Sequence, residues 1–364
     1  MHTAEHPLTK QETTLIAAAY KALSQIIPGF NAREQQKQLI QFAARTYATD
    51  CQSVGEAPTG TGKSFGYQIP GIVLALTRDR RLVISTETAN LQDQIYNNDL
   101  SVLRKVFALL GYEFTSVVAK GRERYVCPLR LEEKDAQGSL MDGEDMSRYV
   151  ADIASAWKKG TWDGLRDSLP FKVPQPIWMS VNNNRHSCTN DRCPAADTCP
   201  HMDVKNRLKD ARVIVTNHSY FLSTVSALYG AENAKKNPVI DFEKNYYAFD
   251  EAHHLHDRII GSFASAAEID EDFLPEVSVM LSILGSPQIP TFKIRSESLR
   301  GLGAALRANV KVLVGKGELH RFTLGEVPSV LRELVQDYAA SVETIVDILD
   351  EAIEEASKQS NQKP

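Results

Sequence analysis

The 364-residue sequence has no long apolar run and no strong excess of either charge. Its apolar stretches are far shorter than the roughly 20 residues that a membrane-spanning helix needs. The first residues, with His2, Glu5 and Lys10, lack the apolar core of a secretory signal. We therefore expect a cytoplasmic protein with no membrane partner. The net charge of −5 gives no global reason to expect nucleic acid, so such a site would have to be a local basic groove.

Cysteine is scarce, and four of the five cysteines are candidates for one metal site. The four are Cys127, Cys188, Cys193 and Cys199. Clustered cysteines in a cytosolic chain indicate metal binding rather than disulfides. The spacing, which has no tight Cys-x-x-Cys pair, favours an iron–sulfur cluster over zinc, although His186 and His201 are alternative zinc ligands. The fifth, Cys51, is expected to be a buried apolar thiol.

A glycine-rich loop, Ala-Pro-Thr-Gly-Thr-Gly-Lys-Ser at 57–64, is the main feature that is present. Ala57 replaces the first glycine of the usual G-x-x-x-x-G-K-[ST] pattern, but two later glycines still allow the backbone to cradle a phosphate chain. Lys63 is expected to place its charge on the β and γ phosphates, and Ser64 to bind magnesium. The predicted nucleotide-binding residues are Pro58, Thr59, Gly60, Thr61, Gly62, Lys63 and Ser64.

A second motif, which is acidic, directly follows a predicted strand at 246–249. Its sequence is Asp-Glu-Ala-His, at 250–253. Asp250 is placed to hold magnesium, and Glu251 to polarise the attacking water. We assign His253 a coupling role, and expect the two later histidines only to pack or face solvent. An Asp-Glu pair at a strand end is a strong signal only because the same chain carries a phosphate loop.

Hydrophobic periodicity predicts an α/β architecture. Predicted helices cover 11–27, 33–47, 65–77 and 91–110, and predicted strands cover 82–85, 114–118, 212–216 and 246–249. The residues at 131–185 are charged and then proline-rich, which is typical of an inserted small domain. After about 263 only long helical patterns remain.

Two further groups of residues are ambiguous from the sequence alone. The amide of Gln36, upstream of the phosphate loop, could pair with adenine, although such a residue is more often simply solvated. A basic segment before the first of the clustered cysteines suits a nucleic-acid backbone with one stacking face, and equally suits a solvated loop. Its members are Lys120, Arg122, Arg124 and Tyr125.

The two motifs together resemble motifs I and II of superfamily 2 helicases, and the four cysteines between them resemble the iron–sulfur branch that includes XPD and DinG. Longer strings resemble the DinG type. They are Leu-Gln-Asp-Gln-Ile-Tyr at 91–96, Gly-Arg-Glu-Arg-Tyr-Val-Cys-Pro at 121–128, Trp-Asp-Gly-Leu-Arg-Asp at 162–167 and His-Arg-Phe-Thr-Leu-Gly-Glu at 320–326. The resemblance extends along nearly the whole chain.

This resemblance implies an ATP-driven, 5′-to-3′ DNA helicase with a 4Fe–4S cluster, acting in DNA repair on single-stranded and forked DNA. It implies a RecA-like motor lobe at 1–112 and 205–262, an iron–sulfur insertion at 113–204 and part of a helical arch at 263–364. It assigns Arg33 and Gln36 to the adenine side of the nucleotide. Its implied DNA contacts are Thr86, Asn90 and Gln92.

The chain departs from the family pattern in one respect. Nothing after Asp257 matches the Gln-x-x-Gly-Arg-x-x-Arg motif of the second motor lobe, whose arginines reach the γ-phosphate. We therefore expect the isolated chain to be weakly active or inactive, with a second lobe supplied in trans. The alternative is a non-catalytic or regulatory module that binds nucleotide and single-stranded DNA.

Overall fold

The computed structural model describes residues 7–58, 60–137, 139–184, 187–229, 237–263, 271–315, 322 and 326–360. Thr59, His186 and most of the string at 320–326 therefore lie outside the described residues. The chain divides into two compact units, Met1–Ala264 and Ser265–Pro364. None of the described helices is both long and apolar enough to span a membrane.

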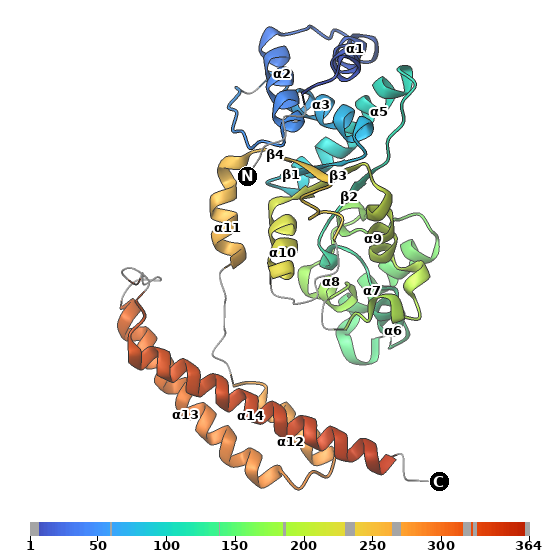
Figure 1. Cartoon of the computed structure of the whole chain (residues 1–364). Coiled ribbons are helices and arrows are strands. Elements are labelled where there is room, and N and C mark those ends of the chain that lie inside the picture. Colours follow the sequence, from blue (N-terminus) through green and yellow to red (C-terminus); the bar gives the residue numbers. More distant parts are fainter. Residues whose placement is uncertain are drawn as a thin grey trace. The chain divides into compact units, whose positions relative to one another are not determined.

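Among the described residues, four parallel strands of the first unit form one sheet in the order β2-β3-β1-β4 (Figure 1). The strands are β1 (Arg81–Thr86), β2 (Ser116–Val118), β3 (Val213–Asn217) and β4 (Asn245–Phe249). Each of them overlaps a strand that the hydrophobic pattern predicts, so the α/β class is confirmed. Parallel pairing brings the carboxyl ends of all four strands to one edge of the sheet, where loops from distant parts of the sequence meet.

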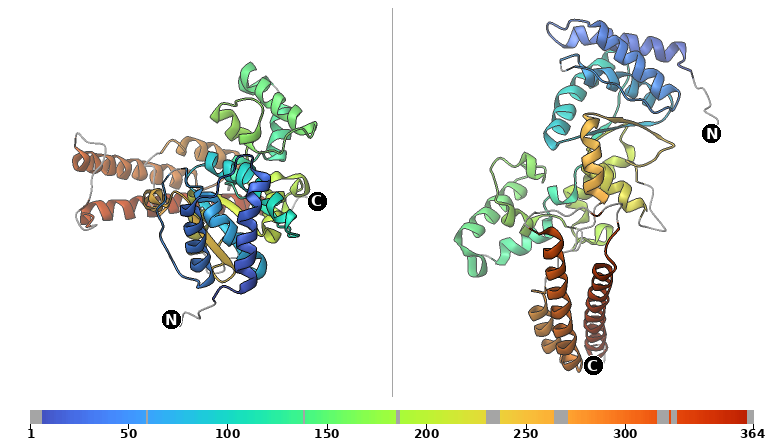
Figure 2. Two further views of the ribbon diagram at one scale, coloured as in Figure 1. Left: turned by 90° about the horizontal axis from the view of Figure 1, so that it is seen from above. Right: turned by 90° about the vertical axis from the view of Figure 1, so that its left-hand side faces the viewer.

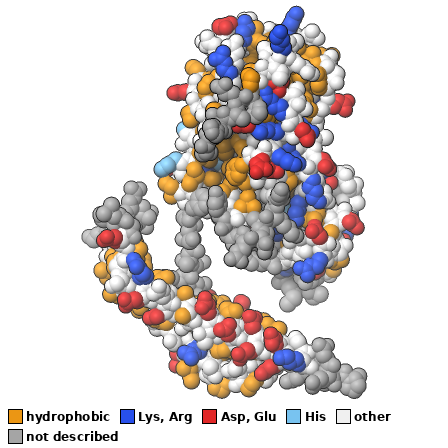
Figure 3. Space-filling model, in the orientation of Figure 1, with side chains coloured by type: hydrophobic (Ala, Val, Ile, Leu, Met, Phe, Trp, Pro, Cys, Tyr) orange, Lys and Arg blue, Asp and Glu red, His pale blue; other side chains and the backbone are white. Residues whose placement is uncertain are grey.

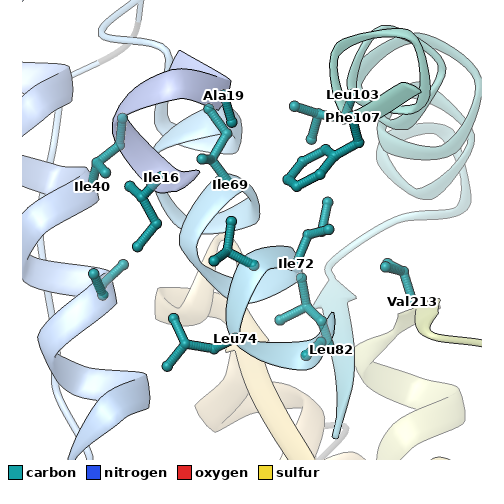
Figure 4. Packing of buried hydrophobic residues seen from close by; sticks show 14 of the residues in the cluster. Ile16, Ala19, Ile40, Ile69, Ile72, Leu74, Leu82, Leu103, Phe107 and Val213 are labelled. Atoms are coloured by element: carbon teal, nitrogen blue, oxygen red, sulfur yellow. The ribbon is translucent and has the colours of Figure 1, made fainter. Parts of the chain in front are cut away.

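Helices cover both faces of this sheet (Figures 1 and 2). On one face lie α1 (Lys10–Ile26), α2 (Glu34–Ala48), α3 (Lys63–Thr77) and α5 (Leu100–Leu109), and on the other α9 (Pro200–Asp210) and α10 (His218–Tyr229). Successive strand residues point to opposite faces. Leu82 and Ile84 of β1 therefore pack into the first core, which Figure 4 shows, while Val83 packs into the second.

The first helix is fixed to the end of α3 by an ion pair with a buried carboxylate as well as by apolar packing. Thr9 and Glu12 form a capping box at the start of α1, in which each side chain binds the other residue's backbone. Glu12 is only 3% exposed, and its carboxylate accepts hydrogen bonds from Arg78 Nε at 2.7 Å and Nη2 at 3.0 Å. This bidentate pair connects the first turn of α1 to the end of α3.

The helix predicted at 91–110 is interrupted. Residues Ala89–Gln94 form α4, residues Ile95–Asp99 form a π-helical turn (η1), and α5 follows. The prediction that this segment is helical is therefore confirmed, but the pattern did not reveal the wide turn, which brings one extra residue into the segment. Such turns often occur at functional sites.

A small helical cluster lies between β2 and β3. It contains α6 (Pro128–Gln137), α7 (Ser139–Lys158) and α8 (Gln175–Val181). These helices share their own apolar core, which includes Ile153, Trp162 and Trp178. Trp162 Nε1 donates a hydrogen bond to Leu165 O at 2.7 Å, and Trp178 Nε1 donates one to Glu123 O at 2.8 Å. The short helices of the first unit are η2 (Arg122–Arg124), η3 (Arg166–Ser168), η4 (Asn190–Arg192), η5 (Ala196–Thr198) and η6 (Ala252–His254).

The first unit ends with α11 (Leu255–Phe263), and the described part of the second unit is helical. The second unit contains α12 (Leu274–Ile283), α13 (Ile289–Val314) and α14 (Ser329–Ser360), as the periodicity predicts. Leu281, Leu299 and Ile345 are part of its core. Acidic side chains gather on the face of this unit that Figure 3 shows.

Candidate functional site

The phosphate loop has the backbone conformation that its sequence predicts. Gly60 and Gly62 both have φ of +78°, a left-handed conformation that residues with a Cβ rarely adopt. Gly62 is also the N-cap residue of α3, so the helix begins at Lys63 with its free N–H groups at the loop. This arrangement favours an anion at the start of the helix.

The acidic pair lies beside this loop, although the two motifs are far apart in the sequence. Asp250 follows the last residue of β4, and its backbone N–H donates to Ser85 O at 2.8 Å. Glu251 has a left-handed φ of +56°, and its carboxylate lies 3.3 Å from Lys63 Nζ. Helix α3 packs against both β1 and β4, so its first residue, Lys63, lies beside Glu251 at the end of β4.

Two more side chains belong to this site, and the sequence analysis missed both. Tyr67 donates a hydrogen bond from Oη to Asp250 Oδ2 at 3.2 Å, and it lies one helical turn after Lys63. Asp99, from the π-helical turn, accepts hydrogen bonds from Ser64 and from Gln68, the latter at 3.5 Å. Burial raises the pKa of Asp99, and these two hydrogen bonds oppose the rise. The i, i+4 spacing from Lys63 is a sequence signal for Tyr67, whereas Asp99 has none.

Gln36 contacts the phosphate loop directly. Its Nε2 donates to Gly62 O at 2.9 Å, and its Oε1 accepts from Tyr20 Oη at 3.0 Å, so both ends of the amide are in use. Gln36 is 3% exposed, and a Cβ placed on Gly62 would lie 2.0 Å from its Nε2. Arg33 is exposed, and its side chain extends toward Gly60. The adenine-side role of both residues stays a prediction.

The histidines after the acidic pair are close to it. His253 Nδ1 lies 3.5 Å from Glu251 Oε2, and the rings of His253 and His254 are 4.0 Å apart. His254 Nε2 in turn lies 3.3 Å from a carboxylate oxygen of Glu87. His254 thus packs on His253 and is partly exposed, as expected, and it also contacts Glu87.

The seven predicted DNA-contacting residues divide into buried and accessible groups. Four are buried: Thr86, Gln92, Lys120 and Tyr125. Gln92 donates from Nε2 to Ala119 O at 2.8 Å and to Val215 O at 3.2 Å, so it ties α4 to the sheet. Asn90 and Arg124 are exposed, and Arg122 is half-buried. In this structure only the accessible three present side chains that a nucleic acid could contact.

Lys120 is held between two carboxylates. Its Nζ lies 2.7 Å from Asp93 Oδ1 and 2.9 Å from Asp167 Oδ2, and its side chain is 3% exposed. Arg124 lies 2.9 Å from the other oxygen of Asp167. Asp93 belongs to α4, whereas Asp167 belongs to η3 in the segment that separates β2 from β3. The ammonium group therefore connects the sheet domain to the inserted segment.

The four clustered cysteines are all among the described residues, and all four are free thiols. Burial raises the pKa of Cys127; backbone hydrogen bonds from Arg130 and Leu129 oppose this, and the charges of Cys199 and Cys193 add to it. Cys127 directly precedes α6, and Cys199 directly precedes α9. Within the described ranges, no three Cys, His, Asp or Glu side chains are grouped closely enough to hold a metal ion.

The alternative zinc ligand His201 and the fifth cysteine, Cys51, lie in different environments. His201 packs against Tyr125 at 5.7 Å between ring centroids, and burial lowers the pKa of this histidine to about 4. Cys51 is exposed, so the expectation of a buried thiol is wrong. The residues before the phosphate loop lie outside the sheet in this structure, which leaves that thiol accessible.

No protein-family model matches this chain. The ATP-dependent DNA helicase DinG of Shigella flexneri is 31% identical in an alignment 370 residues long, which covers 93% of this chain and 50% of that protein. The protein of the same name from Salmonella choleraesuis is 30% identical in an alignment 384 residues long, which covers 97% of this chain and 52% of that protein. A solved structure named XPD helicase aligns with a TM-score of 0.41 and 16% identity, over 90% of this chain and 48% of that one.

The chain therefore spans about half the length of the curated relatives it matches. The similarity to the two DinG proteins confirms the resemblance drawn from the motifs.

Proposed function

We propose that this relative of the DinG-type helicases is the ATP- and DNA-binding part of a 5′-to-3′ DNA helicase. The observation that carries the proposal is the meeting of Lys63 with the Asp250–Glu251 pair at the carboxyl edge of a parallel sheet. A lysine that ends a phosphate loop and a carboxylate pair on a neighbouring strand are the parts that phosphoryl transfer from ATP requires.

Each residue of this site has a role in the proposed reaction. The loop amides and Lys63 bind the phosphates, and Ser64 and Asp250 would hold magnesium, which neutralises charge on the transferring phosphate. Tyr67 orients Asp250 by its hydrogen bond. Glu251 polarises the attacking water. Because Lys63 pairs with Glu251 in this structure, phosphate must draw the ammonium away before the glutamate can act on water.

A complete motor of this type also needs cations that face the γ-phosphate from across the cleft, where an arginine is worth orders of magnitude in rate. We propose that these come from a second motor lobe, in the same or another polypeptide. Single-stranded DNA, in forked or displaced-strand substrates, is the proposed nucleic-acid partner. The accessible candidates for its contact are Asn90, Arg122 and Arg124.

Lys63→Ala is expected to weaken binding of a fluorescent magnesium–ATP analogue by about 10- to 100-fold, because a hydrogen bond to a charged group contributes about 1.5–3 kcal/mol. The matched control is Lys37→Ala, which also removes a lysine that pairs with a glutamate, at 3.1 Å, but on the surface of α2. Fluorescence titration measures both. Equal affinities for the wild type and Lys63→Ala would contradict the assignment.

Hydrolysis separates the helicase proposal from a binding module. Turnover that single-stranded DNA stimulates, and that Lys63→Ala abolishes, supports a motor. Nucleotide binding without turnover, with and without an added second lobe, favours a module in which nucleotide acts only as a switch.

We further propose that Cys127, Cys188, Cys193 and Cys199 hold a 4Fe–4S cluster. The support is chemical, because the set supplies the four thiolates that such a cluster binds. Two of the sulfurs precede helix N-termini, where the helix dipole favours the thiolate that binds iron. When bound, such a cluster supplies a rigid cross-link between distant parts of the inserted segment.

Cys193→Ser is expected to remove the broad visible absorption and the iron and acid-labile sulfide of the anaerobically purified protein, since a cubane cluster normally needs four thiolates. Cys51→Ser is the matched control, because it replaces an exposed thiol outside the set and should leave the spectrum unchanged. A colourless wild-type protein that contains zinc would exclude the cluster and support the alternative with histidine ligands.

A further inference from the structure

We infer that Glu87 is a positioning residue that couples the turn after β1 to the segment after Asp250 and Glu251. The inference rests on the proposed function, because it assigns to Glu87 the coupling of DNA binding at the predicted DNA-contacting turn to nucleotide binding at the phosphate loop. Glu87 itself is not among the predicted nucleotide or DNA contacts.

Glu87 contacts two successive elements that follow the acidic pair. Its Oε2 lies 3.3 Å from His254 Nε2, the end of η6, and its Oε1 lies 3.7 Å from Arg258 Nη2 in α11. The glutamate side chain is 22% exposed, and Arg258 is 46% exposed. Both carboxylate oxygens of Glu87 thus contact the segment that contains His254 and Arg258. A shift of Glu87 or of that segment therefore changes both interactions at once.

A continuous path of contacts leads from Glu87 to the catalytic glutamate. The His254 ring, which Glu87 contacts, lies 4.0 Å from the His253 ring. His253 Nδ1 lies 3.5 Å from Glu251 Oε2. The path therefore contains two imidazole rings between the two carboxylates. A displacement of Glu87 changes the position of the ring that contacts Glu251.

The other end of the path is attached to the predicted DNA-contacting turn. Glu87 lies between Thr86, the last residue of β1, and Thr88, whose Oγ1 accepts from Leu91 N at 3.3 Å and caps α4. The exposed Asn90 is in the first turn of that helix. A ligand that moves the start of α4 must therefore move Glu87 as well.

The backbone beside Glu87 is held more firmly than its side chain. Ser85 O accepts from Asp250 N at 2.8 Å, and Ser85 Oγ lies 2.8 Å from Nδ1 of the fully buried His218. The first contact fixes the end of β1 to the start of the acidic loop, and the second fixes it to the start of α10. The partly exposed contacts of Glu87 with His254 and Arg258 are weaker, because solvent screens them, and so they can change between states. This makes the glutamate side chain, rather than the backbone, the adjustable element.

The test measures coupling as a binding linkage, which does not require turnover. The affinity of a fluorescent, non-hydrolysable ATP analogue with Mg²⁺ is titrated with and without saturating oligothymidylate. Coupling between two sites typically changes affinity by about 5- to 150-fold, and the same factor applies to DNA affinity with and without nucleotide. We expect the wild type to lie in this range. Glu87→Gln should bring the factor to within about twofold of unity, while each ligand alone binds as in the wild type.

Two further variants keep the test specific. Arg258→Gln removes a largely exposed partner of Glu87, so it should lower the coupling factor even if Glu87→Gln folds poorly. Glu34→Gln is the matched control, because it removes a surface glutamate that is 70% exposed on α2 and should leave coupling unchanged.

Unchanged coupling in Glu87→Gln and Arg258→Gln, with both ligands bound normally, would overturn the inference. A wild type that binds both ligands without any coupling would also overturn it and leave the proposed function standing. A wild type that binds neither nucleotide nor DNA would instead overturn the proposed function, and the inference with it.

Discussion

Replacing Lys120 with alanine is expected to lower the free energy of unfolding by about 3 kcal/mol, because breaking a buried ion pair leaves an uncompensated charge. Lys120 Nζ lies within 3 Å of both Asp93 and Asp167, and in the described part of the chain it is the one cation that pairs with Asp93. The two carboxylates are 37% and 22% exposed, so water compensates part of the loss. The value therefore lies at the lower end of the usual range for such pairs.

Urea denaturation followed by tryptophan fluorescence measures this effect, because the indoles of Trp162 and Trp178 lie in the core of the inserted segment. Lys158→Ala is the matched control: it removes a lysine that is 65% exposed and lies 2.7 Å from Asp135. An exposed pair contributes little to stability, because solvent screens the two charges. Similar losses for both variants would show that the burial of Lys120 has no energetic consequence, and would support its role as a free DNA-binding cation.

Replacing Glu12 with glutamine is expected to remove about 3 kcal/mol of stability at neutral pH, since each unit of pKa shift corresponds to about 1.4 kcal/mol. The hydrogen bonds from Arg78 are the largest cause that holds the pKa of Glu12 at about 2, against 4.5 for an unperturbed glutamate. Because the folded-state pKa is depressed, the stabilisation is complete above about pH 4.5 and is lost as the pH falls toward 2.

Denaturation midpoints measured between neutral and acidic pH test this prediction. The wild type should lose stability through the window between pH 4.5 and 2, and Glu12→Gln should lose correspondingly less. Glu34→Gln, which removes an exposed glutamate from the next helix, should follow the wild-type curve. Parallel curves for the wild type and Glu12→Gln would mean that the pair with Arg78 does not stabilise the folded state.

Local patterns were sufficient to predict most elements of the fold. The apolar run at Leu82–Ser85 could only be a buried strand beside helices of period 3.6, and β1 is found there. The phosphate loop and the acidic pair were predicted together because each needs a defined backbone position, which short motifs encode. The packing of α3 against β1 and β4 then brings Lys63 and Glu251 into contact, which is a consequence of tertiary packing rather than of either motif.

Burial of polar side chains could not be predicted in the same way. Lys120 and Arg124 look alike in the sequence, yet one lies between two carboxylates from distant segments and the other faces solvent. Likewise Gln92 satisfies backbone carbonyls at the sheet edge, which no local pattern reveals. Asp99 reaches Ser64 only because the helix before it widens into a π turn. Such positions depend on tertiary contacts, whereas sequence patterns report residue type and local period.

The π-helical turn at Ile95–Asp99 has a consequence for insertions and deletions in this segment. Because its hydrogen bonds enclose one residue more than those of an α turn, the segment corresponds to an α-helix that has gained a residue. One residue rotates the following helix by about 100°. The gained residue thus allows α4 to direct Gln92 at the sheet while α5 buries Leu103 and Phe107. A one-residue deletion there would restore a regular helix, but would force the chain to give up either the apolar packing of α5 or the position of Asp99 beside Ser64.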